Sequence, residues 1–153
     1  ELDVIAAVQP PHMTLDPGGP ERDLGDERVK LMWPFRTMLD EGEMLAFGTD
    51  SPVVDVNSMG VLYSAATRRD PQTRAPEGGW RPEQLISRAE AIRAYTAGSD
   101  AAAQRNGEAG VLAAGKLADM AVLDTDLLTC ADDEILDAHV TATWMGGRCV
   151  FEA

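Results

Sequence analysis

Two short apolar runs restrict the folds open to this chain more than any other feature. Residues 4–8 (VIAAV) and residues 45–47 (LAF) are continuous apolar segments without the alternation of a half-exposed strand. Such runs are typical of parallel strands that are covered on both faces. Between them, residues 26–42 have apolar side chains at helical spacing and contain Pro34, which interrupts a helix or begins a new one. This order predicts a βαβ unit and therefore an α/β fold.

The middle of the chain is expected to be helical. Residues 61–69 have the spacing of a short helix, and a firmer helix is predicted to begin at Ser87. Glu90 follows Ser87 by three residues, which is the capping-box pattern of a first helical turn. This helix is expected to run to about Thr96, and Gly98 then allows a kink or a stop.

The last third of the chain has the pattern of β structure. A strand is predicted over residues 120–123, and residues 140–145 and 149–151 are expected to form a hairpin around two consecutive glycines. This change of pattern predicts two parts, residues 1–106 and residues 107–153.

The charge of the chain restricts its partners. The sequence has 26 acidic and 13 basic residues, with a net charge of −13. Because such a surface repels phosphate groups, nucleic acid and anionic membrane surfaces are not expected partners. The two cysteines, Cys130 and Cys149, have no metal-binding spacing. Two thiols in a chain of 153 residues favour a reducing compartment, with the cytoplasm as the expected location.

Asp50 is the first candidate for a functional residue. In the segment LAFGTDSPV, residues 45–53, an apolar run ends at Gly48 and is followed by residues that favour turns. Asp50 is therefore expected close to the end of a strand. Two interpretations remain open from this segment alone. The carboxylate accepts backbone hydrogen bonds in a turn, as aspartate commonly does, or it projects from the strand end as a functional group.

A series of short segments along the chain carries a resemblance to a known family. In order, these segments are AAVQPPH, DERVKLMWPFRTMLDEG, LAFGTDSPV, AATRRD, GGWRPEQL, AIRAYT, GVLAAGKLADMAVLD and ATWMGGRCVF. Their order and spacing resemble the C-terminal part of metal-dependent amidohydrolases of the YtcJ-like group, amidohydrolase family 3. The resemblance implies that residues 1–106 are the C-terminal portion of a (β/α)8 TIM barrel, about strands 7 and 8 with their helices. It implies that residues 107–153 are part of a small β-sandwich.

The resemblance also implies roles for single residues. Asp50 would stand at the mouth of the eighth strand, where the family's carboxylate binds the catalytic metal and takes a proton from the attacking water. His12 would end the seventh strand and is the candidate for substrate binding, the alternative being a loop histidine hydrogen-bonded to solvent. Arg36 and Arg68 belong to the matched pattern and are interpreted as solvated or structural ion-pair residues. His139 is interpreted as a structural or surface residue.

The chain lacks most of the metal ligands that the resemblance implies. The family pattern has His-x-His on the first strand, a bridging lysine or acid on the fourth, and one histidine on each of the fifth and sixth strands. This chain has only two scattered histidines, and a complete barrel takes about 250 residues. We therefore expect a fragment, inactive by itself, of a hydrolase that uses a divalent metal, zinc in the first place, and a metal-activated water.

The expected substrate is a small molecule with an amide, cyclic amide or N-acyl C–N bond. The alternative is a non-catalytic truncated relative that acts as a subunit or a binding module. The two differ in whether a reading frame upstream of Glu1 encodes the missing histidines.

We expect this polypeptide to be stable only in association with the rest of a parent chain or with copies of itself. The two strands at residues 4–8 and 45–47 would each lack a neighbour on one side, and such edges leave unpaired backbone groups that invite pairing. Analytical ultracentrifugation at micromolar concentration measures the association state. A well-folded monomer with a single sharp melting transition would contradict this expectation and would favour the binding-module alternative.

Overall fold

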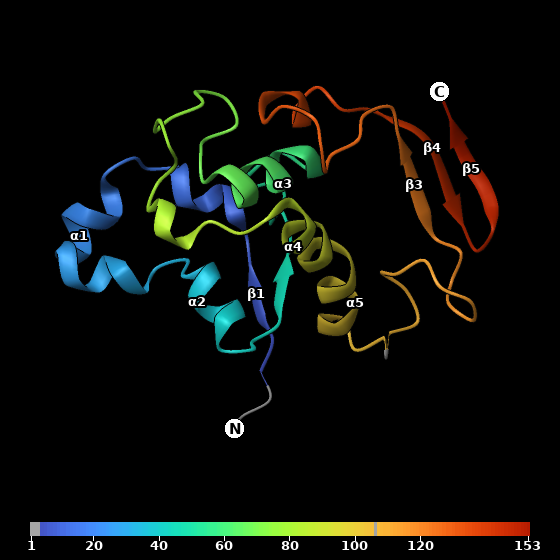
Figure 1. Ribbon diagram of the computed structural model, residues 1–153, viewed down its shortest axis with the longest axis horizontal. Helices are drawn as coiled ribbons and strands as arrows, with labels where there is room; N and C mark the ends of the chain where they lie inside the picture. The colour runs from blue at the N-terminus through green and yellow to red at the C-terminus, as the bar shows by residue number, and fades with distance from the viewer. Residues whose placement is uncertain (1–3, 106) are drawn as a thin grey trace.

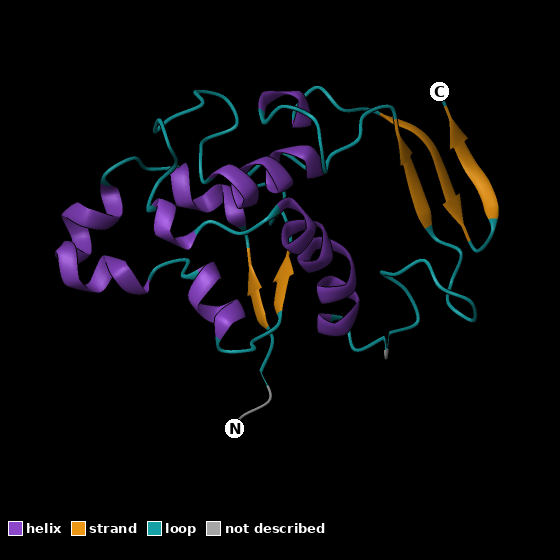
Figure 2. Ribbon diagram, in the orientation of Figure 1, coloured by secondary structure: helices purple, strands orange, loops and turns teal. Residues whose placement is uncertain are grey.

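The parallel strand pair expected from the two apolar runs is present in the computed structural model, which describes residues 4–105 and 107–153 (Figure 1). Strand β1 (Ala6–Val8) pairs with β2 (Leu45–Phe47), in register from the first residue of each strand. All residues of β2 are buried, as expected for a strand covered by helices. Strand β1 differs from the expectation, because Ala7 is exposed and Ala6 and Val8 are half-buried. Figure 2 shows this pair among the helices and a second group of strands toward the C-terminus.

The segment between the two strands contains two helices, so the helix expected over residues 26–42 is divided. Helix α1 (Gly19–Arg28) lies at one end of the molecule, and α2 (Phe35–Asp40) packs against β2 (Figure 1). The break has a local cause. Pro34 has no N–H for a helical hydrogen bond, and Trp33 before it has a left-handed φ of 43°. Pro34 is the N-cap of the new helix.

Helix α3 (Ser58–Thr67) packs against the turn that follows β1. It begins three residues earlier than predicted, because the Asn57 side chain accepts a hydrogen bond from the Met59 N–H at 3.0 Å and caps the first turn. Short 3-10 helices connect the longer elements at Pro10–Thr14, Val29–Leu31, Pro82–Gln84 and Asp133–Ile135.

The predicted capping box at Ser87 is confirmed. The Ser87 side chain accepts a hydrogen bond from the Glu90 N–H, and the Glu90 carboxylate accepts one from the Ser87 N–H. Helix α4 (Arg88–Arg93) continues through a π-helical turn at Ala94–Gly98 into α5 (Ser99–Ala102). The helix therefore widens where a kink or a stop was expected.

A close approach of this helix to β2 fixes the strand. A Cβ atom on Gly98 would overlap the carbonyl oxygen of Leu45, so only glycine fits at that position. The Ser99 hydroxyl donates a hydrogen bond to the Phe47 carbonyl at 2.9 Å. Inside the core, the rings of Phe35 and Phe47 lie 5.2 Å apart. The π-helical turn and the start of α5 are therefore packed directly against the backbone of β2.

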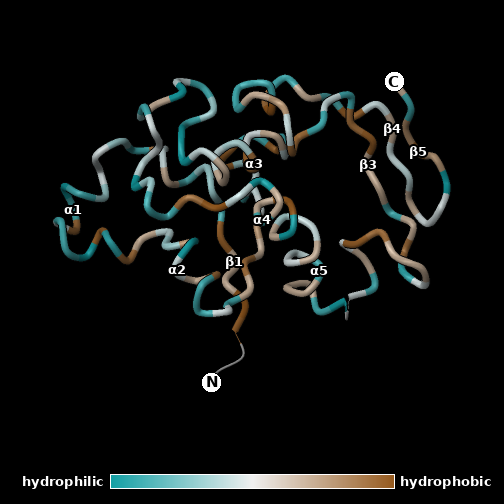
Figure 3. The backbone as a smooth tube through the Cα atoms, viewed as in Figure 1, coloured by the Kyte–Doolittle hydropathy of each residue, from teal (hydrophilic) through white to brown (hydrophobic). Residues whose placement is uncertain are grey.

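The C-terminal strands form a three-stranded antiparallel sheet in the order β3 (Met120–Leu123), β4 (Val140–Met145) and β5 (Arg148–Glu152). Met145 pairs with Arg148 across the two glycines, which confirms the predicted hairpin. Every residue of β5 is exposed. Figure 3 shows hydrophobic residues along β3, whereas α1 is mostly hydrophilic. Within the described ranges, no helix is both long and apolar enough to cross a membrane.

Replacing Gly98 by alanine should lower the free energy of unfolding by about 2 kcal/mol, because the added methyl group meets backbone that cannot move without displacing β2. Gly60→Ala in α3 is the matched control, since the nearest atom to its new Cβ is a proline side-chain atom at 3.8 Å. Urea unfolding followed by circular dichroism measures both variants. Equal midpoints for the two alanines would show that the helix does not press on β2.

Candidate functional site

Asp50 lies at the carboxyl end of the parallel strand pair. It is exposed, follows the last residue of β2 by three positions, and has a left-handed φ of 58°. Aspartate tolerates this conformation better than most residues. Its carbonyl accepts a hydrogen bond from the Val53 N–H at 2.8 Å, while the Thr49 hydroxyl oxygen accepts one from the Ser51 N–H.

The carboxylate of Asp50 is open to a ligand. Within the described ranges, no donor forms a hydrogen bond with it, and the backbone and the Thr49 side chain make the turn instead. A backbone conformation of this kind in a loop that follows a strand is a feature found at functional sites. The geometry therefore suits a carboxylate that binds something from outside the turn.

His12 lies at the same edge of the strand pair. It belongs to the 3-10 helix Pro10–Thr14, directly after β1, and its N–H donates to the Gln9 carbonyl at 3.1 Å. The ring is half-buried, and its Nε2 atom is shielded from solvent without a hydrogen-bond partner among the described residues. The fold thus places His12 and Asp50 at the carboxyl ends of two adjacent parallel strands.

The described residues do not by themselves make a metal site. Over residues 4–105 and 107–153, no group of three or more His, Cys, Asp and Glu side chains could hold a metal ion. Asp50 can supply one oxygen ligand, and a catalytic zinc site takes about three protein ligands. Cys130 is half-buried, Cys149 is exposed, and both are free thiols.

Arg68 is buried and bonded to carbonyl groups, so its interpretation as a solvated or ion-pair residue is wrong. Its side chain is fully buried, and its guanidinium donates to the carbonyl of Trp80 at 2.6 Å and to that of Trp33 at 3.1 Å. The guanidinium carbon lies 5.3 Å from the ring centre of Phe35 and 5.4 Å from that of Trp80. Burial lowers the pKa of Arg68 to about 10, which leaves it charged at neutral pH.

Trp80 is the centre of this arrangement, which we call the Trp80 cluster: Glu21, Trp33, Arg68, Trp80 and Arg81. Trp33 contacts the Trp80 ring edge-on, with ring centres 5.8 Å apart. The Arg81 guanidinium lies 5.8 Å from the Trp80 ring centre and donates to the Val29 carbonyl at 2.8 Å. The Trp80 indole N–H donates to the Glu21 carboxylate at 2.6 Å. The cluster therefore fastens α1 and the segment before α2 to the loop that follows α3.

Sequence reasoning missed the Trp80 cluster, although its signal was present. The segment GGWRPEQL belongs to the matched series, yet no role was assigned to its tryptophan or arginine. Gly79 in this segment approaches the Thr67 carbonyl so closely that a Cβ atom would overlap it. A glycine pair before an aromatic residue and an arginine was the pattern that could have indicated a tight junction.

Arg36 has the structural role expected for it. Its guanidinium forms ion pairs with Asp40 at 2.8 Å and with Glu90 at 2.9 Å, which join α2 to α4. The hydrogen bond from Arg36, together with the Ser87 N–H, lowers the pKa of the Glu90 carboxyl. His139 is exposed and lies 3.5 Å from the Asp124 carboxylate, in agreement with a surface role.

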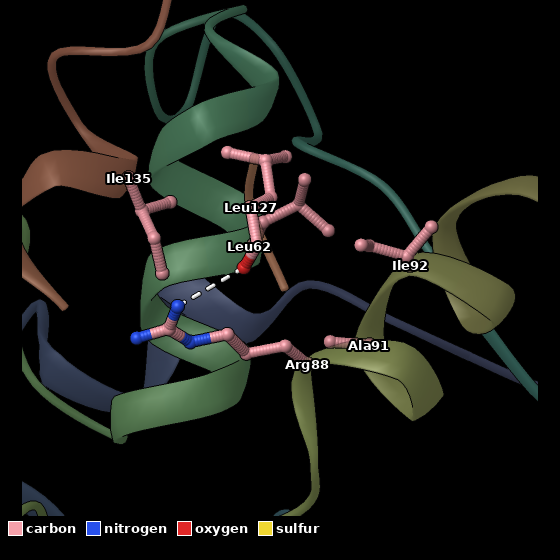
Figure 4. Close-up of a pocket in the computed structure, with 6 residues that line it drawn as sticks. All are labelled: Leu62, Arg88, Ala91, Ile92, Leu127 and Ile135. Atoms are coloured by element: carbon pink, nitrogen blue, oxygen red, sulfur yellow. Dashed lines mark hydrogen bonds between the residues drawn. The ribbon is translucent and has the colours of Figure 1, made fainter. Parts of the chain in front are cut away.

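A small apolar pocket between α3, α4 and the loop before β4 has no room for a ligand (Figure 4). Its volume is about 10 Å³, the space of a single water at most. Arg88 closes one side and donates to the Leu127 carbonyl at 3.0 Å, as the dashed line in Figure 4 shows. This pocket is a packing feature, and the candidate chemistry stays at the carboxyl ends of β1 and β2.

Comparison with known proteins identifies a family model and three relatives that match this chain. A family model described as "Amidohydrolase family" matches residues 1–151. The chain is 33% identical over 152 residues to Protein LONG AFTER FAR-RED 3 of Arabidopsis thaliana, a match that covers 99% of this chain and 25% of that protein. It is 31% identical over 131 residues to N-substituted formamide deformylase of Arthrobacter pascens, covering 86% of this chain and 23% of that enzyme.

A third relative is YtcJ of Bacillus subtilis (strain 168). It is 26% identical over 129 residues, which are 84% of this chain and 24% of that protein. The chain thus spans about a quarter of the length of these curated relatives. No solved structure matches the chain.

We expect Arg68→Lys to lower the free energy of unfolding by about 2 kcal/mol. Lysine has no planar group to lie against the Phe35 and Trp80 rings, and its ammonium cannot reproduce the fork that serves two carbonyls. Arg28→Lys on the exposed side of α1 is the control and should leave the stability unchanged. Thermal unfolding monitored by near-UV circular dichroism compares the two. A negligible effect at Arg68 would show that the cluster tolerates any cation.

Proposed function

The chain belongs to the amidohydrolase family, and from this membership we propose that it is part of a hydrolase that cleaves C–N bonds in amide, cyclic amide or N-acyl compounds. Two findings support the proposal. The family model covers nearly the whole chain, and one relative is named as a deformylase of N-substituted formamides. The remaining parts of the active site would come from polypeptide that the longer relatives have and these 153 residues do not include.

The position of Asp50 is the observation that carries this proposal. In α/β barrels, catalytic groups come from the carboxyl ends of the parallel strands, and Asp50 is an exposed carboxylate at such an end. A divalent metal ion, for which we propose zinc, supplies an activated water in hydrolases of this type. Asp50 would contribute one ligand and accept the proton of the attacking water.

His12 would contact the substrate. Its solvent-shielded Nε2 can donate or accept a hydrogen bond, and His12 lies in the 3-10 helix that follows β1, the strand next to β2. We assign it to substrate binding rather than to the metal. A small molecule is the expected substrate, and we propose a cytoplasmic location because a chain of 153 residues with two cysteines favours a reducing compartment.

The two parts of the chain fit different places in such an enzyme. Residues 1–106 contain the parallel strand pair with its helices and would be about strands 7 and 8 of a (β/α)8 barrel. Residues 107–153 contain the antiparallel sheet and would be part of a β-sandwich beside it. Short parallel strands with helices in their connections support the first assignment.

Asp50→Asn in the full-length protein should reduce turnover by about 100-fold or more, since the amide keeps the shape but cannot accept the proton. The fold should remain, because asparagine also tolerates the left-handed conformation at this position. Asp55→Asn is the matched control: it is an exposed carboxylate in the same loop, and its amide oxygen can still accept the Asn57 N–H. Amine release from an N-substituted formamide measures turnover. Parental activity in Asp50→Asn would identify Asp50 as a turn residue.

A further inference from the structure

The loop that follows β2 carries exposed apolar side chains close to Asp50. Val53 is 60% exposed and Val56 is 74% exposed. Single exposed apolar residues are common on protein surfaces and need no explanation. These two, however, share one loop with the candidate catalytic carboxylate, at the carboxyl end of the strand pair. Their role depends on how the loop holds them relative to Asp50.

A tight turn fixes Val53 next to Asp50. The Val53 N–H donates to the Asp50 carbonyl at 2.8 Å, which is the hydrogen bond between the first and fourth residues of a β-turn. The Cα atoms at the two ends of such a turn lie less than about 7 Å apart. Both side chains are exposed. A small molecule whose reacting bond lies at the Asp50 carboxylate can therefore extend to Val53.

A second set of hydrogen bonds holds the backbone around Val56. The Asp55 carboxylate accepts the Asn57 N–H at 2.7 Å, and the Asn57 side chain accepts the Met59 N–H at 3.0 Å at the start of α3. Met59 is buried in the core. The loop is therefore tied to α3 on either side of Val56, while the valine side chain is exposed. Groups that are held in place before a ligand arrives lose less entropy when it binds.

The side chains of this loop are suited to an uncharged hydrocarbon group. The Asp55 carboxylate already accepts a backbone N–H, whereas the Asp50 carboxylate accepts no hydrogen bond among the described residues. Residues 51–57 include three valines and no lysine or arginine. Sites for small molecules are lined mainly by apolar side chains, with a few polar groups that fix the orientation of the ligand. Asp50 would be the polar group here, and the valines the apolar side.

We propose that Val53 and Val56 contact the hydrocarbon substituent of the substrate and so select its class: amides whose nitrogen carries an uncharged alkyl or aryl group. This inference rests on the proposed function, because it takes Asp50 as the reacting carboxylate. In a formamide the substituent on nitrogen is the only hydrocarbon, so it is the part that contacts the valines. A longer alkyl group buries more apolar surface against them and binds more tightly.

Hydrolysis of two N-substituted formamides by the full-length protein, measured by amine release, tests the inference. N-butylformamide and N-methylformamide have the same reacting bond and differ only in the length of the alkyl chain. We expect kcat/KM to be at least about tenfold higher for N-butylformamide. Equal values, or a higher value for N-methylformamide, would overturn the inference and leave the proposed hydrolysis standing. Hydrolysis of neither compound would contradict the proposed function and this inference together.

Variants locate the residues that make the selection. Val53→Thr keeps the branched shape of valine and replaces one methyl group by a hydroxyl. It should lower the ratio of kcat/KM for N-butylformamide to that for N-methylformamide by about fivefold. Val111→Thr is the matched control, because Val111 is also a loop valine, 45% exposed, and this variant should keep the parental ratio.

The ratio separates substrate selection from a purely structural role. If Val53 only supported the turn, Val53→Thr would lower both kcat/KM values and leave their ratio unchanged. An unchanged ratio in Val53→Thr, or an equal fall in Val111→Thr, would contradict the assignment. Val56→Thr gives the same comparison from the second valine and decides the matter if Val53→Thr does not fold.

Discussion

The guanidinium of Arg68 joins parts of the chain that are far apart in the sequence. Trp33 precedes α2, Phe35 begins it, and Trp80 follows the long loop after α3, yet all three contact this one side chain. Burying a charge without a carboxylate partner is costly. Two carbonyl acceptors and two aromatic rings offset part of this cost, while Nη2 of Arg68 has no hydrogen-bond partner among the described residues.

The position of Asp50 depends on a different set of contacts. Strand β2 is short, and three residues cannot hold their own orientation. Its position comes from the helix behind it, where Gly98 allows backbone contact and Ser99 bonds to the Phe47 carbonyl. The candidate catalytic carboxylate is therefore placed by residues about 50 positions later in the sequence. The contacts that pack β2 against the helix thus also determine the position of the candidate catalytic carboxylate.

Features governed by neighbouring residues could be predicted from the sequence. The apolar runs of β1 and β2, the capping box at Ser87 and the two-glycine hairpin each follow from short-range rules. The turn character around Asp50 was predictable for the same reason. Its proposed role required the ordered series of family segments, because the local pattern left two interpretations open.

Features that depend on distant contacts could not be predicted in this way. The left-handed Trp33 that divides the helices has its carbonyl bonded to Arg68, 35 residues away. Glu21 and Trp80 are 59 residues apart, so the glycine pair before Trp80 could indicate a tight junction but not that Glu21 is its partner. Pro34 therefore interrupts the helix expected over residues 26–42 for a local reason, and the distant contact of Trp33 with Arg68 adds support for the left-handed residue before it.

The hydrogen bonds of Arg88 affect how the C-terminal part of the protein would unfold. From the first residue of α4 it donates to the carbonyls of Leu127 and Cys130 and to the Asp132 carboxylate, so the segment leading into β4 is bonded back to a helix that packs in the core. The segment between β3 and β4 is thereby attached to α4 by three hydrogen bonds from one side chain. Amide exchange in that segment would then follow the cooperative opening of the helix rather than the fraying of an exposed sheet.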